Sequence, residues 1–386
     1  MRKWLLPEAI EDVLPVEAAR VEALRRLLLD HFRAHGYRLV QPPLVEYLES
    51  LLTGTGRDLD LLTFKTVDPL SGRMLGLRAD TTPQVARIDA HLLNEAGVTR
   101  LCYAGSVLRT ATSTPGDTRQ VVQIGAELYG HPDIAADGEI MRLHLSALAC
   151  ARVHGLHLDL GHVGIYRALA RAAGLDGSGE KDDAELFVAL RDKDTPAVHE
   201  LTAALPEPAR GALRALATLY GPADATLAAA RDVLPALPEV TAALDALAYL
   251  AQAATGVSAV HVDLADLRGY HYYTGATFSV FAPGERGEVL DCGRGGRYDG
   301  VGRAFGRARP ATGFSLDLRR LAALAGGTPM RAPIAAPDDG ADVGLARAIA
   351  ELRAQGEAVV VALPGETNAY GRRLVHDGGR WRVEET

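Results

Sequence analysis

Residues Arg100–Gly130, RLCYAGSVLRTATSTPGDTRQVVQIGAELYG, decide the fold of this chain. An apolar, β-prone run ends at Arg109, a segment rich in Thr, Ser, Pro and Gly follows, and a second β-prone run comes after it. Two such runs around such a loop predict an antiparallel hairpin. Alternation along the second strand places Gln123 and Glu127 on one face of the sheet.

The polar residues of this hairpin indicate a binding site. An amide and a carboxylate on one sheet face are costly to bury unless they bind something polar. Arg109, at the end of the first strand, would add a cation to the same surface. The alternative is a structural hairpin whose polar side chains satisfy one another, and the hairpin alone does not decide between the two.

The composition excludes several classes of protein. The chain has 386 residues, 48% hydrophobic and 23% charged, which suits two or three globular domains with a large core. A net charge of −8 gives no overall basic surface for nucleic acid. The apolar runs are too short to span a membrane, and the N-terminus lacks the apolar core of a signal peptide. Three widely spaced cysteines favour a reducing compartment without a disulfide framework or zinc cluster. We therefore expect a cytoplasmic protein with no cofactor and no metal.

The first part of the chain predicts a mixture of helix and sheet. Apolar periodicity predicts a helix over residues 15–36, and two strands around a turn are expected within residues 63–78. The segment 80–84 then offers a threonine N-cap with proline at the first helical position. Helix capping is therefore the structural explanation for Asp80 and Thr82.

The later part predicts an insertion and a second domain. Ala, Leu, Arg and Glu dominate from about residue 165 to 255, which predicts a small helical bundle inserted into the sheet domain. Sheet character returns at residues 257–264. Residues 326–386 begin with a proline-containing linker after Gly327, which carries Pro329, Pro333 and Pro337, and their later helix, strand and hairpin patterns predict a short α/β domain.

A second polar motif follows the insertion. Residues 267–278 read LRGYHYYTGATF, with Arg268 followed by the aromatic pair Tyr272 and Tyr273. A guanidinium can grip a carboxylate while aromatic rings wall an imidazole. The alternative is a strand whose tyrosines face the core. The acid and amide of the hairpin favour the binding interpretation.

These segments resemble the class II aminoacyl-tRNA synthetases in their histidyl form. The hairpin is similar to motif 2 of that family, and residues 267–278 to its histidine-specific signature. Residues 292–300, CGRGGRYDG, and 311–321, ATGFSLDLRRL, are similar to its Gly-Gly-Arg-Tyr-Asp string and its motif 3. The resemblance covers roughly residues 1–325, with every motif in family order.

The resemblance implies a fold and a site. The fold is α+β: an antiparallel synthetase-like sheet domain at 1–325, with a helical insertion at about 165–255 and a truncated α/β domain at 326–386. Dimerisation through the first helix and strand is implied as well. The implied histidine-binding residues are Asp80, Thr82, Arg109, Gln123, Glu127, Arg268, Tyr272 and Tyr273. Asp80 replaces a family glutamate and is one methylene shorter, and His271 replaces an aspartate.

The nucleotide side departs from the family pattern. Ala111 stands where the family has a glutamate beside ATP, and Val121 where it has an adenine-stacking phenylalanine. Asp317 replaces a small glycine under the nucleotide, and Asp117 the arginine of the loop. An acid pointing at a phosphate would repel it. The tail is also shorter than an anticodon-binding domain, so aminoacylation and tRNA binding are not expected.

A histidyl-synthetase-like body with an altered ATP site and a short tail resembles the regulatory subunits of ATP phosphoribosyltransferase. The resemblance implies a non-catalytic subunit that a short catalytic subunit needs for activity in the first step of histidine biosynthesis. It also implies feedback inhibition by histidine. The implied assembly is a homodimer within a hetero-oligomer, which we expect to be a hetero-octamer.

Two other functions stay open at this point. A divergent histidyl-tRNA synthetase, activating histidine with ATP, is favoured by Arg109, Arg268 and Arg320. A free-standing histidine or tRNA sensor without a catalytic partner is the second. Feedback could also act at an interface between subunits rather than in the synthetase-like pocket.

Overall fold

The computed structural model describes residues 4–54, 57–112, 117–179, 183–284, 286–325, 331–366 and 370–385. The chain divides into two compact units, residues 1–326 and 327–386, and each is described by itself. The central loop residues 113–116 of the predicted hairpin lie outside the described residues, as do residues 326–330 of the predicted linker.

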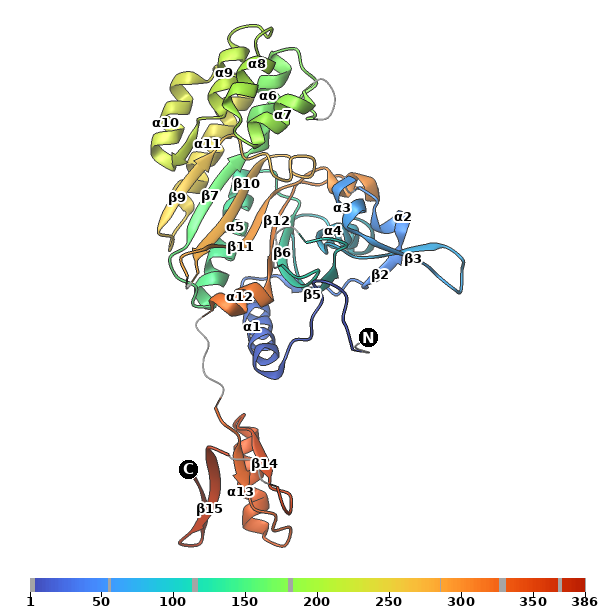
Figure 1. Cartoon of the computed structure of the whole chain (residues 1–386), viewed down its shortest axis with the longest axis vertical. Helices are drawn as coiled ribbons and strands as arrows, with labels where there is room; N and C mark the ends of the chain where they lie inside the picture. The colour runs from blue at the N-terminus through green and yellow to red at the C-terminus, as the bar shows by residue number, and fades with distance from the viewer. Residues whose placement is uncertain are drawn as a thin grey trace. The chain divides into compact units, whose positions relative to one another are not determined.

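A nine-stranded sheet forms the centre of the first unit (Figure 1), in the order β1-β5-β6-β12-β11-β10-β7-β9-β8. Neighbouring strands are antiparallel except for β1 with β5 and β7 with β9, which are parallel. The strands are β1 Arg38–Leu39, β5 Thr99–Leu108, β6 Gln120–Tyr129, β7 His157–His162, β8 Tyr220–Pro222, β9 Ala259–Asp263, β10 Ala276–Pro283, β11 Val289–Arg297 and β12 Ala311–Asp317.

Strands β5 and β6 are the predicted hairpin. They pair over their whole length, with Thr99 opposite Tyr129 and Leu108 opposite Gln120. The other edge of β6 pairs with β12, so β6 lies inside the sheet. Its side chains alternate between the two faces of the sheet, as the sequence pattern predicted.

Helices cover one face of this sheet. In α1 (Pro15–Ala34), Leu24, Leu28 and Phe32 recur at helical spacing and are buried. They share a core with α5 (Ile134–Cys150), α12 (Leu318–Leu324) and the apolar face of β6. The polar residues of β6 therefore face the opposite side. None of the helices in the described part of the chain is long and apolar enough to cross a lipid bilayer.

A smaller subdomain stands beside the β5 end of the sheet (Figure 1). Its three-stranded sheet has the order β2-β4-β3, and β3 and β4 are the two strands predicted within residues 63–78. Helix α4 starts at Thr82 with proline in its first turn, but Thr81, the N-cap residue, makes no side-chain cap. Instead, Asp80 Oδ1 accepts a hydrogen bond from Thr82 N at 3.1 Å. The elements are β2 Val45–Tyr47, α2 Leu48–Leu51, α3 Arg57–Leu62, β3 Phe64–Val67, β4 Met74–Leu77, α4 Thr82–Arg87 and the π-helix η1 Ile88–Leu93.

The helical insertion lies at the other end of the sheet, beyond β7 and β9 (Figure 1). The predicted bundle is confirmed, with one difference: β8 interrupts it and pairs with β9. This strand is only Tyr-Gly-Pro, which has no strand pattern, and the neighbouring edge of β9 organises it. The helices are α6 Val163–Ala172, α7 Ala184–Arg191, α8 Thr195–Leu201, α9 Ala209–Leu216, α10 Ala223–Val233 and α11 Pro238–Ala253.

The second unit is a four-stranded sheet with the order β14-β13-β15-β16 and one packed helix, α13. Leu345 and Ile349 of α13 are buried against Ile334, Val359 and Leu374 of the sheet. The predicted helix, strand and final hairpin are present, whereas β13 was not predicted. The elements are β13 Ile334–Ala336, α13 Val343–Ala354, β14 Val359–Val361, β15 Arg372–Asp377 and β16 Arg380–Glu385.

Candidate functional site

The face of the large sheet that the helices leave uncovered carries a cavity of about 780 Å³. Its walls come from β6, β10, β11 and β12, the turn before β10, and the segment that enters α4. All eight residues proposed from the sequence line it. These residues are Asp80, Thr82, Arg109, Gln123, Glu127, Arg268, Tyr272 and Tyr273.

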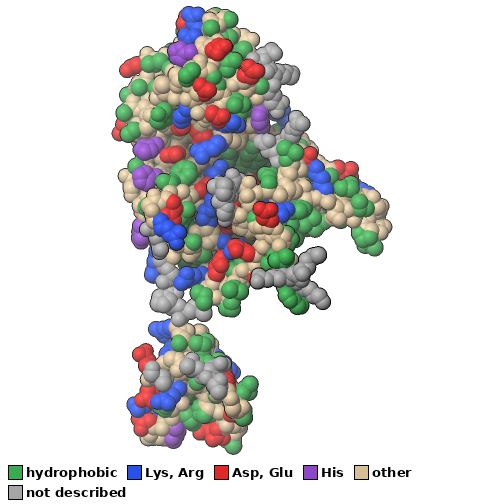
Figure 2. Space-filling model, in the orientation of Figure 1, with side chains coloured by type: hydrophobic (Ala, Val, Ile, Leu, Met, Phe, Trp, Pro, Cys, Tyr) green, Lys and Arg blue, Asp and Glu red, His purple; other side chains and the backbone are tan. Residues whose placement is uncertain are grey.

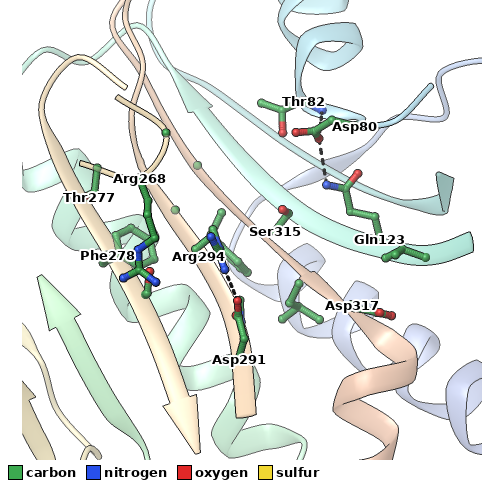
Figure 3. A pocket seen from close by; sticks show the side chains of 18 of the residues that line it. Asp80, Thr82, Gln123, Arg268, Thr277, Phe278, Asp291, Arg294, Ser315 and Asp317 are labelled. Atoms are coloured by element: carbon green, nitrogen blue, oxygen red, sulfur yellow. Dashed lines mark hydrogen bonds and ion pairs between the residues drawn. The ribbon is translucent and has the colours of Figure 1, made fainter. Parts of the chain in front are cut away.

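One side of the cavity holds a fixed carboxylate and amide (Figure 3). Gln123 Nε2 donates to Asp80 Oδ1 at 2.9 Å, and Gln123 Oε1 accepts from Thr81 N at 3.0 Å. These two bonds set the orientation of the amide. The Asp80 carboxylate and the Gln123 Oε1 oxygen are acceptors that lie side by side. They therefore suit an ammonium group, which is a donor only.

Glu127 is the deepest acid of the cavity, with 1% of its surface exposed. Its carboxylate accepts hydrogen bonds from Thr82 Oγ1 at 2.9 Å, from Tyr103 Oη at 3.1 Å and from Tyr298 Oη. Burial raises the pKa of Glu127 to about 8, although these three hydroxyls oppose the rise. Near neutral pH this carboxyl can therefore either donate to or accept from a ring nitrogen.

Tyr103 and Tyr298 are functional candidates that the sequence reasoning did not select. Tyr103 lies opposite Gly125 in the β5–β6 pairing, and a side chain on Gly125 would collide with the Tyr103 hydroxyl. The hairpin register could have identified Tyr103 on this ground. Tyr298 stacks on Tyr272 with ring centroids 5.0 Å apart. The buried Tyr272 hydroxyl has no hydrogen-bond partner in the described part of the chain.

The arginines of the cavity differ in what they already bind. Arg268 lies on the opposite side from Asp80 and Gln123 (Figure 3), and Asp266 holds it through two bonds of 2.8 and 2.7 Å. Arg109 instead donates Nε to the Ala79 carbonyl at 3.2 Å and has no ion pair within the described ranges. Arg109 is therefore freer than Arg268 to bind an anionic group.

The part of the cavity that corresponds to the nucleotide side of the synthetases contains two ion pairs among the described residues. Arg320 binds Asp117 at 2.6 Å, and Arg294 binds Asp291. Asp317 lines the same region, and its Oδ1 accepts from Arg319 N at 2.9 Å at the start of α12. Because Asp117 already neutralises Arg320 and Asp317 adds an acid, a polyphosphate beside Arg320 would meet a cation that is already paired and an acid that repels it.

Comparison with known proteins first defines the class. The model of the family described as histidyl-tRNA synthetase matches residues 9–321. A solved histidyl-tRNA synthetase from a Nostoc species shares the fold, with a TM-score of 0.76 at 16% identity over 97% of this chain and 92% of that one. The first unit is therefore a class II, histidyl-tRNA synthetase-like domain.

More similar relatives define the family. The regulatory subunit of ATP phosphoribosyltransferase from Ralstonia nicotianae is 57% identical over 389 residues, which cover 100% of this chain and 98% of that one. Its namesake from Burkholderia cenocepacia is 55% identical over 394 residues and the full length of both. The chain belongs to the family of ATP phosphoribosyltransferase regulatory subunits.

Two further matches agree with this assignment. Residues 331–384 match the model described as ATP phosphoribosyltransferase subunit HisZ C-terminal domain. A solved ATP phosphoribosyltransferase regulatory subunit/histidyl-tRNA synthetase from Bacillus halodurans has a TM-score of 0.80 at 26% identity, over 95% of each chain.

Proposed function

We propose that this chain is a non-catalytic regulatory subunit that binds free histidine in the cavity of its synthetase-like domain. The observation that carries the proposal is the contrast between the two sides of that cavity. The amino-acid side keeps Asp80, Gln123 and Glu127 in one hydrogen-bonded arrangement. On the nucleotide side, the Asp117–Arg320 ion pair replaces an open cation.

Each part of histidine has a matching group in the cavity. The ammonium group is placed at the Asp80 carboxylate and the Gln123 Oε1 oxygen, because both of these groups accept hydrogen bonds. The carboxylate is placed at Arg109, and at Arg268 where it can compete with Asp266. The imidazole is placed between aromatic rings against the Glu127 carboxyl, which can share a proton with a ring nitrogen.

The proposed partner is the short catalytic subunit of ATP phosphoribosyltransferase. Support comes from the relatives, which are named as regulatory subunits of that enzyme. In this proposal the chain forms a homodimer within a hetero-octamer in the cytoplasm, enables catalysis in the first step of histidine biosynthesis, and inhibits it when histidine binds. Histidine controls the enzyme only if it binds the active and inactive assemblies with different affinities.

The test is phosphoribosyl-ATP formation by the short catalytic subunit, with and without this chain and with added histidine. We expect activation by the chain and its reversal by histidine. Glu127→Ala should keep the activation and lose the reversal, and Glu127→Gln serves as a second variant that preserves the side-chain shape. Failure of the folded wild-type chain to activate the enzyme would overturn the proposal.

The proposal also includes the absence of aminoacylation and of tRNA binding. The altered nucleotide side supports the first, because adenylation needs charge stabilisation on the transferring phosphate. Basic and acidic side chains are interspersed over the face of the first unit shown in Figure 2, without a continuous basic surface. Histidine-dependent ATP–pyrophosphate exchange would contradict the absence of aminoacylation. An electrophoretic shift with tRNA would contradict the absence of tRNA binding.

A further inference from the structure

The turn of residues 267–273 has its tyrosines in two different surroundings. Tyr272 and Tyr273 line the cavity, and Tyr272 stacks on Tyr298. Tyr270 instead lies within the helical insertion, against Tyr166 of α6 at 5.6 Å and Phe187 of α7 at 5.0 Å between ring centroids. One short turn therefore contributes a wall to the cavity and an anchor to the insertion.

The turn is folded tightly, so its two ends cannot move independently. The backbone N–H groups of Tyr272 and Tyr273 both donate to the Gly269 carbonyl, at 2.9 and 2.8 Å. Gly269 has φ +69°, and a side chain there would collide with the Tyr273 ring. A shift of the Tyr273 ring would therefore displace Gly269 and, through the backbone, Tyr270.

Arg167 of α6 joins the insertion to this turn. Its Nη2 donates to the Tyr270 carbonyl at 2.7 Å and to the Tyr273 carbonyl at 3.0 Å. Its guanidinium carbon also lies 4.4 Å from the centroid of the Tyr270 ring. A single side chain of the insertion thus holds the residue anchored in the helices and the residue that lines the cavity.

We propose that Arg167 is a positioning residue for the ligand cavity, and that residues 267–273 transmit occupancy of the cavity to helices α6 and α7. The part that concerns occupancy rests on the proposed binding of histidine. A ligand that packs on Tyr272 and Tyr273 constrains the turn, and Arg167 passes that constraint to α6. By reciprocity, whatever fixes α6 and α7 strengthens ligand binding.

The matched variants are Arg167→Ala, Arg167→Lys and Arg171→Ala. Arg171 lies one helical turn further along α6, and its only ion pair in the described structure is a 4.0 Å contact with Glu239. Arg171→Ala therefore removes an arginine from the same helix that makes no hydrogen bond to the turn in the described structure. Lysine at position 167 keeps a cationic donor but not the fork geometry, so it should rescue part of the effect.

The first measurement is hydrogen exchange of the ligand-free proteins. Arg167→Ala should speed exchange of the Tyr272 and Tyr273 amides, with Arg167→Lys in between and Arg171→Ala like wild type. Unchanged exchange in folded Arg167→Ala would overturn the positioning role. This result does not depend on histidine, so it stands apart from the proposed function.

The second measurement is calorimetry with histidine. Arg167→Ala should bind about tenfold more weakly than wild type, while Arg171→Ala should bind normally. In wild type, saturating histidine should slow exchange in α6 and α7, and in Arg167→Ala it should slow only β6. Slowing of exchange in α6 and α7 of both proteins would overturn transmission through Arg167.

Absence of any histidine binding to the wild type would overturn the transmission of cavity occupancy together with the proposed function. The exchange of the ligand-free proteins would still decide whether Arg167 is a positioning residue.

Discussion

The carboxylate of Glu127 occupies the place where Gly313 would carry a Cβ atom. The two residues face each other across strands β6 and β12. The acid can therefore turn into the cavity only because its neighbour on the next strand has no side chain.

Gly313→Ala should consequently displace Glu127 and weaken histidine binding at least about tenfold, with a loss of about 1–3 kcal/mol of unfolding free energy from overpacking. Gly300→Ala is the matched control, because Gly300 has φ −81° and open space around its Cβ position. Calorimetry and urea denaturation measure the two effects. Normal histidine affinity in Gly313→Ala would show that the acid does not contact the ligand.

Glu127 should also make stability depend on pH. Burial raises its pKa from 4.5 to about 8, so between these values the folded chain holds a proton that the unfolded chain has released. The unfolding free energy should therefore fall as pH rises through this window, by up to about 1.4 kcal/mol per pH unit from this group. Glu127→Gln should remove this slope. Urea midpoints of both proteins from pH 5 to 9 test it, and parallel curves would contradict it.

A buried ion pair beside the cavity should matter more for stability than exposed pairs do. Arg297 binds Asp137, whose side chain is 1% exposed, and also the carbonyls of His131 and Asp133. Arg297→Met should cost about 3–5 kcal/mol, because it leaves a buried acid without its partner. Arg33→Met, in the exposed pair with Asp30, should cost less than about 1 kcal/mol. Similar costs for the two variants in denaturant titrations would refute the difference.

The Asp117–Arg320 ion pair should lower the affinity of the cavity for polyphosphate. Asp117→Ala removes an acid and frees the Arg320 guanidinium, so affinity for tripolyphosphate should rise at least about fivefold at low salt. Asp192→Ala changes the net charge equally, on the insertion and next to Arg191, and should leave affinity unchanged. Calorimetry at two salt concentrations separates a local effect from a general one. Equal gains in both variants would contradict exclusion by this pair.

Much of the fold could be predicted because its signals are local. The alternation that places Gln123 and Glu127 on one face belongs to a single strand, and the period of Leu24, Leu28 and Phe32 to a single helix. The motif strings then indicated which separated segments share a site. All eight proposed residues indeed line one cavity, while their binding of histidine stays a prediction.

What the sequence did not reveal depends on contacts between distant segments. The sequence did not show whether Arg268 pairs with Asp266 or binds a ligand carboxylate, since both interactions use the same guanidinium. The hydroxyl of Tyr298 reaches Glu127 only through the order of the strands. Strands β8 and β13, of three residues each, form because a neighbouring edge is available to them.

The strand order has a consequence for the chain as it leaves the ribosome. Tyr103, which binds Glu127, precedes it by 24 residues, whereas Tyr298 follows it by 171. Strand β12, the inner neighbour of β6, is likewise made only after the whole helical insertion. Until then the nascent hairpin presents an unpaired β6 edge, a template on which two growing chains can join. Synthesis of this protein should therefore benefit from chaperones that shield β6 until residue 317 has emerged.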